Sequence, residues 1–290
     1  MKTIIAKLTA KAPISHGAFD DGGDVGNAML FRREPIVSLD GFPRVPVVSG
    51  NSLRGILRRG LMREVLLNAE ITIETFEGVF PNELQAKRAW DRMYAVLACG
   101  GTLEGALDDT VRPEETRILR RKFPALSLLG SAMYTKMIGG MAQIGFVWPV
   151  CSETIAGGLV QFSECKYSAE EIITEVGQVR HIDRENADPE LTGVKPMPIT
   201  IEALATGTTL ESRIKLLPHS TSLERACLIH GLKSLSTIGG KSGSGFGVID
   251  VSLSDEDDLE YTEWLDARKT GGSKHEEFKT FITEFARKLG

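Results

Sequence analysis

Residues 45–59 read VPVVSGNSLRGILRR and open the clearest helix in this 290-residue chain. Apolar side chains recur at spacings of three and four, which is the period of a helix packed on a core. Ser49 or Asn51 can cap the first turn, so the backbone N–H groups behind the cap are free to meet an anion. The apolar positions are Leu53, Ile56, Leu57, Leu61 and Val65, and the other faces carry Arg54, Arg58, Arg59 and Arg63.

Strand-like segments surround this helix. Residues 2–13 alternate apolar and polar side chains, and residues 199–216 alternate like two strands joined by a Thr-Gly turn. Residues 222–240 repeat the helical pattern, and residues 246–253 are typical of a closing strand. The order strand, helix, insertion, strands, helix, strand predicts an α/β protein of the α+β type with a ferredoxin-like βαββαβ core.

The rest of the chain is arranged around this core. We expect the core domain to span residues 1–253, with a helical insertion at about 70–125. Residues 14–29 are polar and glycine-rich and predict a loop, and residues 31–48 predict a short hairpin. The last segment, residues 254–290, is expected to form a C-terminal helical extension.

A glycine-rich loop, GGKSGSGFG, occupies residues 239–247. Small residues let backbone N–H groups approach an anion, so the loop is a candidate phosphate cradle. It is not a Walker loop, because Lys241 and Ser242 lie inside it and it leads from a helix into a strand. The same order excludes a dinucleotide fingerprint, which needs a strand followed by a helix. The alternative, that the glycines only end the helix and relieve positive φ, stays open.

The composition favours a cytoplasmic protein without a metal or cofactor. The net charge of -5 argues against a strongly basic nucleic-acid binder, although a local basic groove is compatible with it. The four cysteines form no CxxC pair and are expected to be buried thiols of a reducing compartment. No apolar run approaches the roughly 18 residues of a membrane span. No His/Cys/Asp spacing indicates zinc, and His230 is expected to pack rather than to bind a metal.

The helix start and the glycine loop together resemble one family. Residues 46–58 and 239–249 are similar to the RAMP superfamily (repeat-associated mysterious proteins), specifically to the Cas7-like backbone subunit of CRISPR effector complexes. Two further stretches, residues 126–150 and 196–214, are similar to family segments in the same order. The resemblance implies a ferredoxin-like, RRM-like domain with a protruding β-hairpin thumb, which would lie at about 165–197 here.

The resemblance is closer to the type IV branch than to type III, because FRREP at 31–35 and Asn51 look like the type IV subunit. In type III relatives, an aspartate in a loop after the first strand cuts target RNA. The corresponding position falls near Ala28 and Met29, which carry no carboxylate, and the nearby aspartates of residues 20–24 are out of register. We therefore expect no catalytic residue. The alternative is a type III-like backbone subunit with target-RNA endonuclease activity from an aspartate in 20–24.

The resemblance implies that the chain binds CRISPR guide RNA in a ribonucleoprotein complex for antiviral defence. Further copies of the chain would polymerise along the guide as a helical filament, beside other effector-complex subunits, and support base pairing with target DNA or RNA. Cations, hydroxyls and backbone N–H groups bind phosphates without reading sequence, and an apolar thumb residue, Met197 or Ile182, would wedge between bases. The candidate RNA-binding residues are Arg32, Arg33, Ser49, Asn51, Ser52, Arg54, Arg58, Arg59, Lys136, Arg180, His181, Arg184, Lys195, Met197, Lys241, Ser242 and Ser244.

Ordinary packing or a solvated surface is the alternative role for each of these side chains. A third hypothesis for the whole chain is an enzyme that binds a small phosphorylated molecule through the glycine loop. That enzyme would have a discrete nucleotide pocket and would carry no RNA. The acidic stretch at 254–261 is expected to face solvent or to meet a basic patch on a neighbouring copy.

Overall fold

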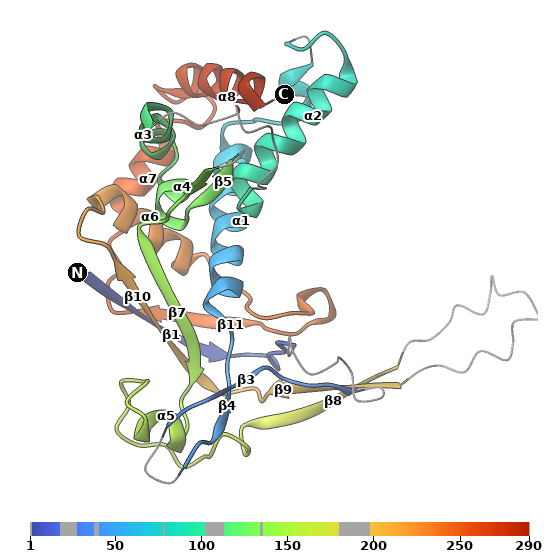
Figure 1. The fold of residues 1–290 in the computed structure, drawn as a ribbon, viewed down its shortest axis with the longest axis vertical. Coiled ribbons are helices and arrows are strands. Elements are labelled where there is room, and N and C mark those ends of the chain that lie inside the picture. Colours follow the sequence, from blue (N-terminus) through green and yellow to red (C-terminus); the bar gives the residue numbers. More distant parts are fainter. Residues whose placement is uncertain are drawn as a thin grey trace, which may run out of the picture.

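A four-stranded antiparallel sheet forms the centre of the protein. The computed structural model describes residues 2–17, 28–37, 41–77, 79–101, 113–133, 136–179 and 198–289. Within this sheet the strand order is β11-β1-β10-β7, and every neighbouring pair is antiparallel. In Figure 1 the sheet lies between a layer of helices at one end and smaller sheets at the other. Its strands are β1 (Lys2–Ala10), β7 (Ala142–Pro149), β10 (Thr209–Leu216) and β11 (Ile249–Leu253).

Two helices, α1 (Gly50–Asn68) and α6 (Ser222–Lys233), share one hydrophobic core with this sheet. The pattern expected for the first strand is present, because Ile4, Ala6, Leu8 and Ala10 are buried in that core and alternate with more exposed residues. The helix α1 follows β1 in the chain and α6 joins β10 to β11. The helix α1 buries one apolar stripe and leaves its polar face for other contacts, whereas α6 is buried on most of its surface.

Smaller sheets flank the centre. The strand β9 lies between β8, which pairs with it antiparallel, and β2, which pairs with it parallel. Phe246 of the glycine loop is buried with Ile201 and Ala203 of β9 in a second hydrophobic cluster. This cluster fastens the loop to the β2-β9-β8 sheet. The strands are β2 (Ala28–Met29), β3 (Arg33–Pro35), β4 (Arg44–Pro46), β5 (Ser131–Met133), β6 (Lys136–Ile138), β8 (Ile173–Val179) and β9 (Pro198–Leu204).

The other helices gather mostly at one end of the molecule (Figure 1). The ring of Phe123, within the expected insertion, lies 5.7 Å from that of Phe278 in the C-terminal extension, so the two segments share a core. Among the described residues, no helix combines the length and the apolar character needed to cross a membrane. The helices are η1 (Ile73–Phe76), α2 (Glu83–Tyr94), the π-turn η2 (Ala95–Cys99), α3 (Pro113–Lys122), α4 (Pro124–Leu129), α5 (Ser152–Ala156), α7 (Leu259–Asp266) and α8 (His275–Leu289).

The cysteines correct one expectation. All four are free thiols, but only Cys151 and Cys227 are buried; Cys99 is exposed and Cys165 is intermediate. Cys99 is the last residue of the π-turn and lies at the surface. The spacing of the cysteines in the sequence does not indicate this exposure. Burial raises the pKa of the Cys151 thiol to about 11, which leaves it protonated and unreactive at neutral pH.

Candidate nucleic-acid interface

The N-terminus of α1 is held firmly against the sheet. The Ser49 hydroxyl accepts a hydrogen bond from the Ser52 N–H at 3.2 Å, which is the expected N-cap. The Ser49 N–H donates to Nε2 of His16 at 3.2 Å. Burial, with Arg32 nearby, lowers the pKa of His16, so the imidazole is neutral and can accept this bond. A Cβ at Gly50 would lie 2.4 Å from the carbonyl oxygen of Ile144, so only glycine lets α1 approach β7 this closely.

Two of the predicted RNA-binding arginines on α1 bind backbone carbonyls. Nη2 of Arg54 donates to the carbonyl oxygen of Ala142 at 3.1 Å. Nη2 of Arg58 donates to the carbonyl oxygens of Leu129 and Gly130 at 2.9 and 3.1 Å. Burial and the nearby Arg54 charge lower the pKa of Arg58. These contacts connect α1 to β7 and to the end of α4, so both side chains stabilise the fold.

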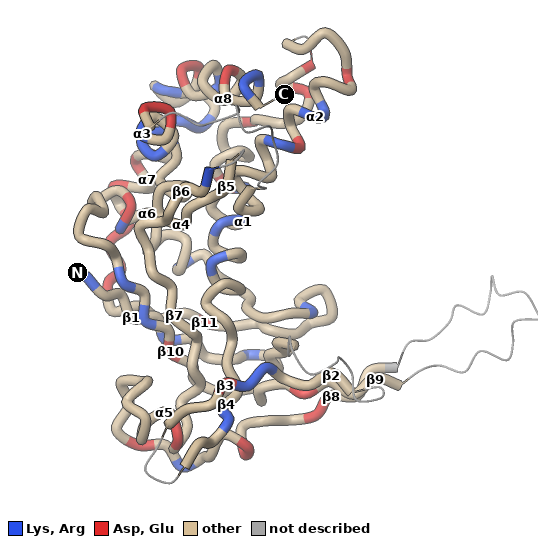
Figure 2. The backbone as a smooth tube through the Cα atoms, in the orientation of Figure 1, with Lys and Arg blue, Asp and Glu red and all other residues tan. Residues whose placement is uncertain are grey.

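The next two arginines of α1 line a groove, although Arg63 also donates from Nε to the Tyr94 hydroxyl at 3.0 Å. The groove has a volume of about 570 Å³ and lies between α1, the end of α6 and the glycine loop. Arg59 and Arg63 line it on one side, and Ser242 of the loop lines it on the other. Figure 2 shows basic positions along α1 and another on the loop that extends from the sheet beside it. The lining residues are Ile56, Leu57, Arg59, Gly60, Leu61, Arg63, Glu64, Gly231, Ser234, Leu235, Ser236, Thr237, Gly239 and Ser242.

The groove therefore brings together Arg59 and Ser242, two predicted residues that are 183 positions apart in the chain. It also contains polar residues that the sequence analysis did not select: Arg63, Ser234, Ser236 and Thr237. One sequence signal could have found Arg63, because it follows Arg59 by four residues and so shares its helix face. The hydroxyl residues after α6 carry no such signal.

The glycine loop combines two kinds of glycine. Gly239 and Gly247 have φ of +80° and +79°, and an added Cβ would lie 2.4 Å from the Ser15 carbonyl oxygen and 2.0 Å from that of Ile238. These two positions shape the turn. Gly243 is different, because it has no positive φ and nothing lies within 4 Å of its Cβ position.

The tip of the loop faces outward. Ser242 and Ser244 are exposed in a short 3-10 turn, η4 (Ser242–Ser244). Lys241, just before the turn, adopts the left-handed conformation with φ +57°, which non-glycine residues rarely do. Among the described residues, no ion pair involves Lys241.

Arg32, just before β3, and Arg33, its first residue, are neutralised by carboxylates. Arg32 donates to Oε1 of Glu34 from Nε and Nη2, at 3.0 and 2.6 Å. Arg33 donates from Nη1 to Oε2 of Glu202 at 2.8 Å, and only 19% of its side chain is exposed. Both guanidinium groups thus have protein partners.

The remaining candidates lie elsewhere. Asn51 is exposed on the first turn of α1, and Lys136 is half-buried on β6, outside the groove. Ala28 and Met29 form β2, which pairs with Thr200 and Ile201. The described part of the expected thumb, residues 165–179, contains β8, which pairs antiparallel with β9 just beyond the expected range. Other predicted residues lie outside the described part of the chain: Asp20, Asp21, Asp24, Arg180, His181, Ile182, Arg184, Lys195 and Met197.

A charged cluster borders the groove beside Glu64. Nε2 of His230 lies 3.0 Å from the Glu64 carboxylate, and Nδ1 lies 3.0 Å from that of Asp258. The bond to Glu64 raises the pKa of His230, and Asp258 adds to the effect. Asp258 also binds Lys233, and Arg225 pairs with Asp255. The acidic stretch expected to face solvent or a neighbouring copy is thus partly engaged by α6 of its own chain.

Comparison with solved structures identifies the fold of this protein. No family model and no curated protein matches the chain. A solved chain of a type IV-B CRISPR complex matches with a TM-score of 0.58, over 87% of this chain and 90% of that one, at 20% identity. This protein has the fold of a type IV-B CRISPR complex chain. The crystal structure of Thermofilum pendens Csc2 also matches, with a TM-score of 0.39 and 14% identity, over 99% of this chain and 76% of that one.

The likeness confirms, at the level of the fold, the resemblance carried by the start of α1 and the glycine loop. The groove is lined by α1 from Ile56 onward and by Gly239 and Ser242 of the loop, whereas the first turn of α1 lies outside the lining. The α+β class expected from the order of elements is likewise present.

Proposed function

We propose that this protein is a non-catalytic backbone subunit of a type IV-like CRISPR effector complex and binds the guide RNA in the groove between α1 and the glycine loop. The observation that carries the proposal is the groove itself. It places Arg59, Arg63 and the Ser242 hydroxyl around one hollow, in a chain with the fold of a type IV-B CRISPR complex chain. Because arginines and hydroxyls bind phosphate and sugar oxygens, such a lining suits an RNA backbone of any sequence.

The central sheet supports a ferredoxin-like core for this function. Its order β11-β1-β10-β7, with α1 after the first strand and α6 before the last, is the arrangement that a βαββαβ unit produces. In this reading, Arg54 and Arg58 orient α1 through carbonyl contacts, while Arg59, Asn51 and Ser52 meet the RNA. Lys241 and Ser244 extend the interface along the loop.

The filament and its other contacts belong to the same proposal. Copies of the chain follow one another along the guide RNA, other complex subunits join them, and the guide pairs with target DNA or RNA. A thumb at the end of β8 and β9 would kink the guide with Arg180, His181, Arg184, Lys195 and Met197. Arg32, Arg33 and Lys136 would lie at contacts with RNA or with a neighbouring copy.

Co-expression with a CRISPR array tests RNA binding. The purified protein should show a 260/280 nm absorbance ratio typical of nucleoprotein and a discrete RNA on a denaturing gel. Replacing the groove arginines, Arg59→Ser with Arg63→Ser, should strip most of this RNA, because each phosphate contact contributes through counterion release. The matched control is Arg88→Ser, an exposed arginine of α2 outside the groove. Equal RNA content in the groove variant and the control would refute the groove as the site.

A cleavage assay separates the proposal from the type III-like alternative. The complex, complementary RNA and magnesium should give intact RNA over hours. Regularly spaced cleavage that Asp24→Ala abolishes would establish the nuclease and refute a non-catalytic subunit.

A further inference from the structure

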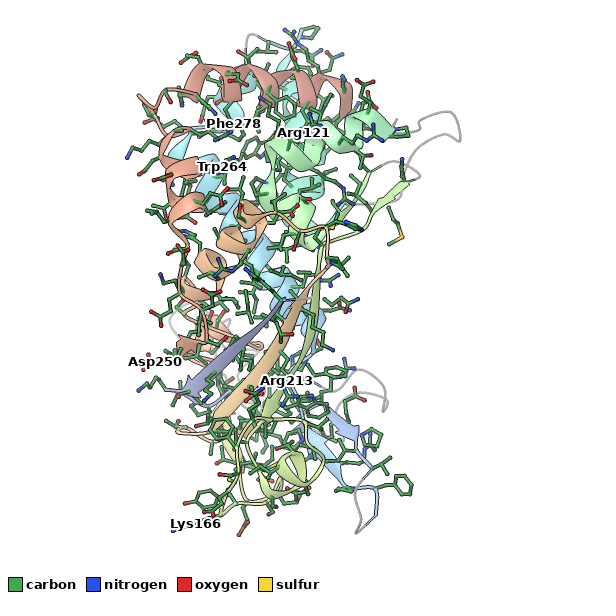
Figure 3. All side chains as sticks on the ribbon, turned by 90° about the vertical axis from the view of Figure 1, so that its left-hand side faces the viewer. Arg121, Lys166, Arg213, Asp250, Trp264 and Phe278 are labelled. Carbon is green, nitrogen blue, oxygen red and sulfur yellow. The ribbon has the colours of Figure 1, made fainter. Side chains whose placement is uncertain are left out.

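A second cleft lies away from the RNA groove and shares no lining residue with it. It has a volume of about 480 Å³ and is formed by α3, the adjoining part of α4, the residue before β7 and the start of α6. The view in Figure 3 faces the side of the molecule that carries Arg121, one of its lining residues. Its volume is within the range of small-molecule sites.

Two buried polar groups in this cleft have no partner. The Ser127 side chain lines the cleft, the residue is 1% exposed, and its Oγ has no hydrogen bond among the described groups. Arg120 donates from Nη2 to the carbonyl oxygen of Gly139 at 2.7 Å, but its Nη1 is buried without a partner. Because buried donors are nearly always satisfied in folded proteins, these two groups are available to a ligand that accepts hydrogen bonds.

The charge of the cleft favours an anion. Arg117, Arg120 and Arg121 follow one another at helical spacings on α3, and all three line the cleft. Among the described residues, no ion pair involves any of the three. Two carboxylates also line the cleft. That of Glu224 accepts from the Thr221 N–H at 2.7 Å in the cap of α6, and Glu260 is exposed. Three arginines against two carboxylates leave a positive balance.

The rest of the lining is apolar. Pro124, Met141 and Leu223 supply hydrocarbon surface beside the arginines, and His219 lies at the same cleft. A ligand that uses both parts needs an anionic group and an apolar body. We propose that this cleft binds a nucleotide unit, with its terminal phosphate on Arg117, Arg120, Arg121 and Ser127 and its base against the apolar lining. Either a free nucleoside monophosphate or the phosphorylated end of a strand offers this chemistry.

Calorimetric titration of the full chain with AMP tests the proposal. The protein is expressed without a CRISPR array and washed free of RNA at high salt. We expect AMP to bind, inorganic phosphate to bind more weakly, and adenosine to bind weakest. The variant Arg117→Gln with Arg121→Gln changes only exposed positions and should weaken AMP at least about tenfold, as loss of one charge-assisted hydrogen bond would. Ser127→Ala should weaken it by a smaller factor. Arg88→Gln should leave AMP binding unchanged.

Comparison with a 5′-phosphorylated RNA hexamer identifies the source of the nucleotide. If the hexamer binds more tightly than AMP and still binds the Arg59→Ser, Arg63→Ser variant, the ligand of the cleft is the phosphorylated end of a strand. A hexamer weaker than AMP assigns it to a free nucleotide. The proposal is overturned if AMP does not bind, if adenosine or phosphate binds as well as AMP, or if the Arg117, Arg121 variant binds AMP like the wild type. None of these results depends on the groove, so RNA binding there is judged separately.

Discussion

The arginines of α1 should divide into a structural pair and an RNA-binding pair, and neighbouring substitutions can separate them. Arg58 holds two carbonyl oxygens at 2.9 and 3.1 Å, whereas the exposed Arg59 lines the groove. Methionine keeps much of the aliphatic stem at either position and removes the guanidinium. The two variants, Arg58→Met and Arg59→Met, thus remove a guanidinium from adjacent positions. At Arg58 that guanidinium binds carbonyl oxygens, and at Arg59 it lines the groove.

The cost of Arg58→Met follows from its contacts. Hydrogen bonds to charged groups contribute about 1.5–3 kcal/mol each, so losing two costs about 4.5 kcal/mol at the central value, and removing the unpartnered Nε returns about 2 kcal/mol. The free energy of unfolding should therefore fall by about 2.5 kcal/mol. Arg59→Met touches no such bond and should stay within about 0.5 kcal/mol of wild type. Urea denaturation followed by circular dichroism measures both values.

RNA binding should show the opposite pattern. For single strands, log K falls with log salt by about 0.7 for each phosphate neutralised, so Arg59→Met should reduce the slope by about that amount. Arg58→Met should leave the slope unchanged under conditions where the variant is folded. Fluorescence anisotropy with a labelled RNA at several salt concentrations measures the slope. If Arg58→Met lowers the slope and Arg59→Met does not, the assignment of the two pairs is wrong.

Two further predictions concern the border of the groove. The raised pKa of His230 stabilises the fold below about pH 6.5, its ordinary value, and this contribution is lost as pH rises through the higher folded-state pKa. The free energy of unfolding, measured in urea from about pH 6.5 to mildly alkaline pH, should thus decline in the wild type. It should change less in His230→Gln; equal slopes would contradict the ion pairs with Glu64 and Asp258. In the glycine loop, Gly247→Ala should lower the melting temperature by several degrees, because a Cβ there would lie 2.0 Å from the Ile238 carbonyl oxygen. Gly243→Ala has open space and should melt like the wild type, and a comparable loss in both variants would refute this distinction.

Local patterns predicted the framework of the protein well. The alternation of β1 and the three-four spacing of α1 are short-range signals, and the residues they select are buried in the core except Ile56, which is partly buried against it. The Ser49 cap is also local, because a serine side chain reaches only its own first turn. These features depend on a few neighbouring residues, so the sequence alone contains them.

The chemistry of the arginines depends on distant partners. Arg33 is neutralised by Glu202, which is 169 residues away, and Arg58 reaches carbonyls more than 70 residues away. Nothing within a few residues of either arginine distinguishes it from Arg59. A candidate list drawn from the sequence therefore mixes cations that hold the fold together with cations that face a groove, and only the tertiary contacts separate the two.

The glycine loop illustrates both roles within nine residues. Gly239 and Gly247 are needed where the chain passes close to Ser15 and Ile238, and Phe246 fastens the loop to β9. These contacts account for the turn without any ligand. They also fix the position of Ser242 at the groove, across from Arg59. The choice between a cradle and a turn is therefore not exclusive, because the glycines that shape the backbone are also the ones that place Ser242 at the groove.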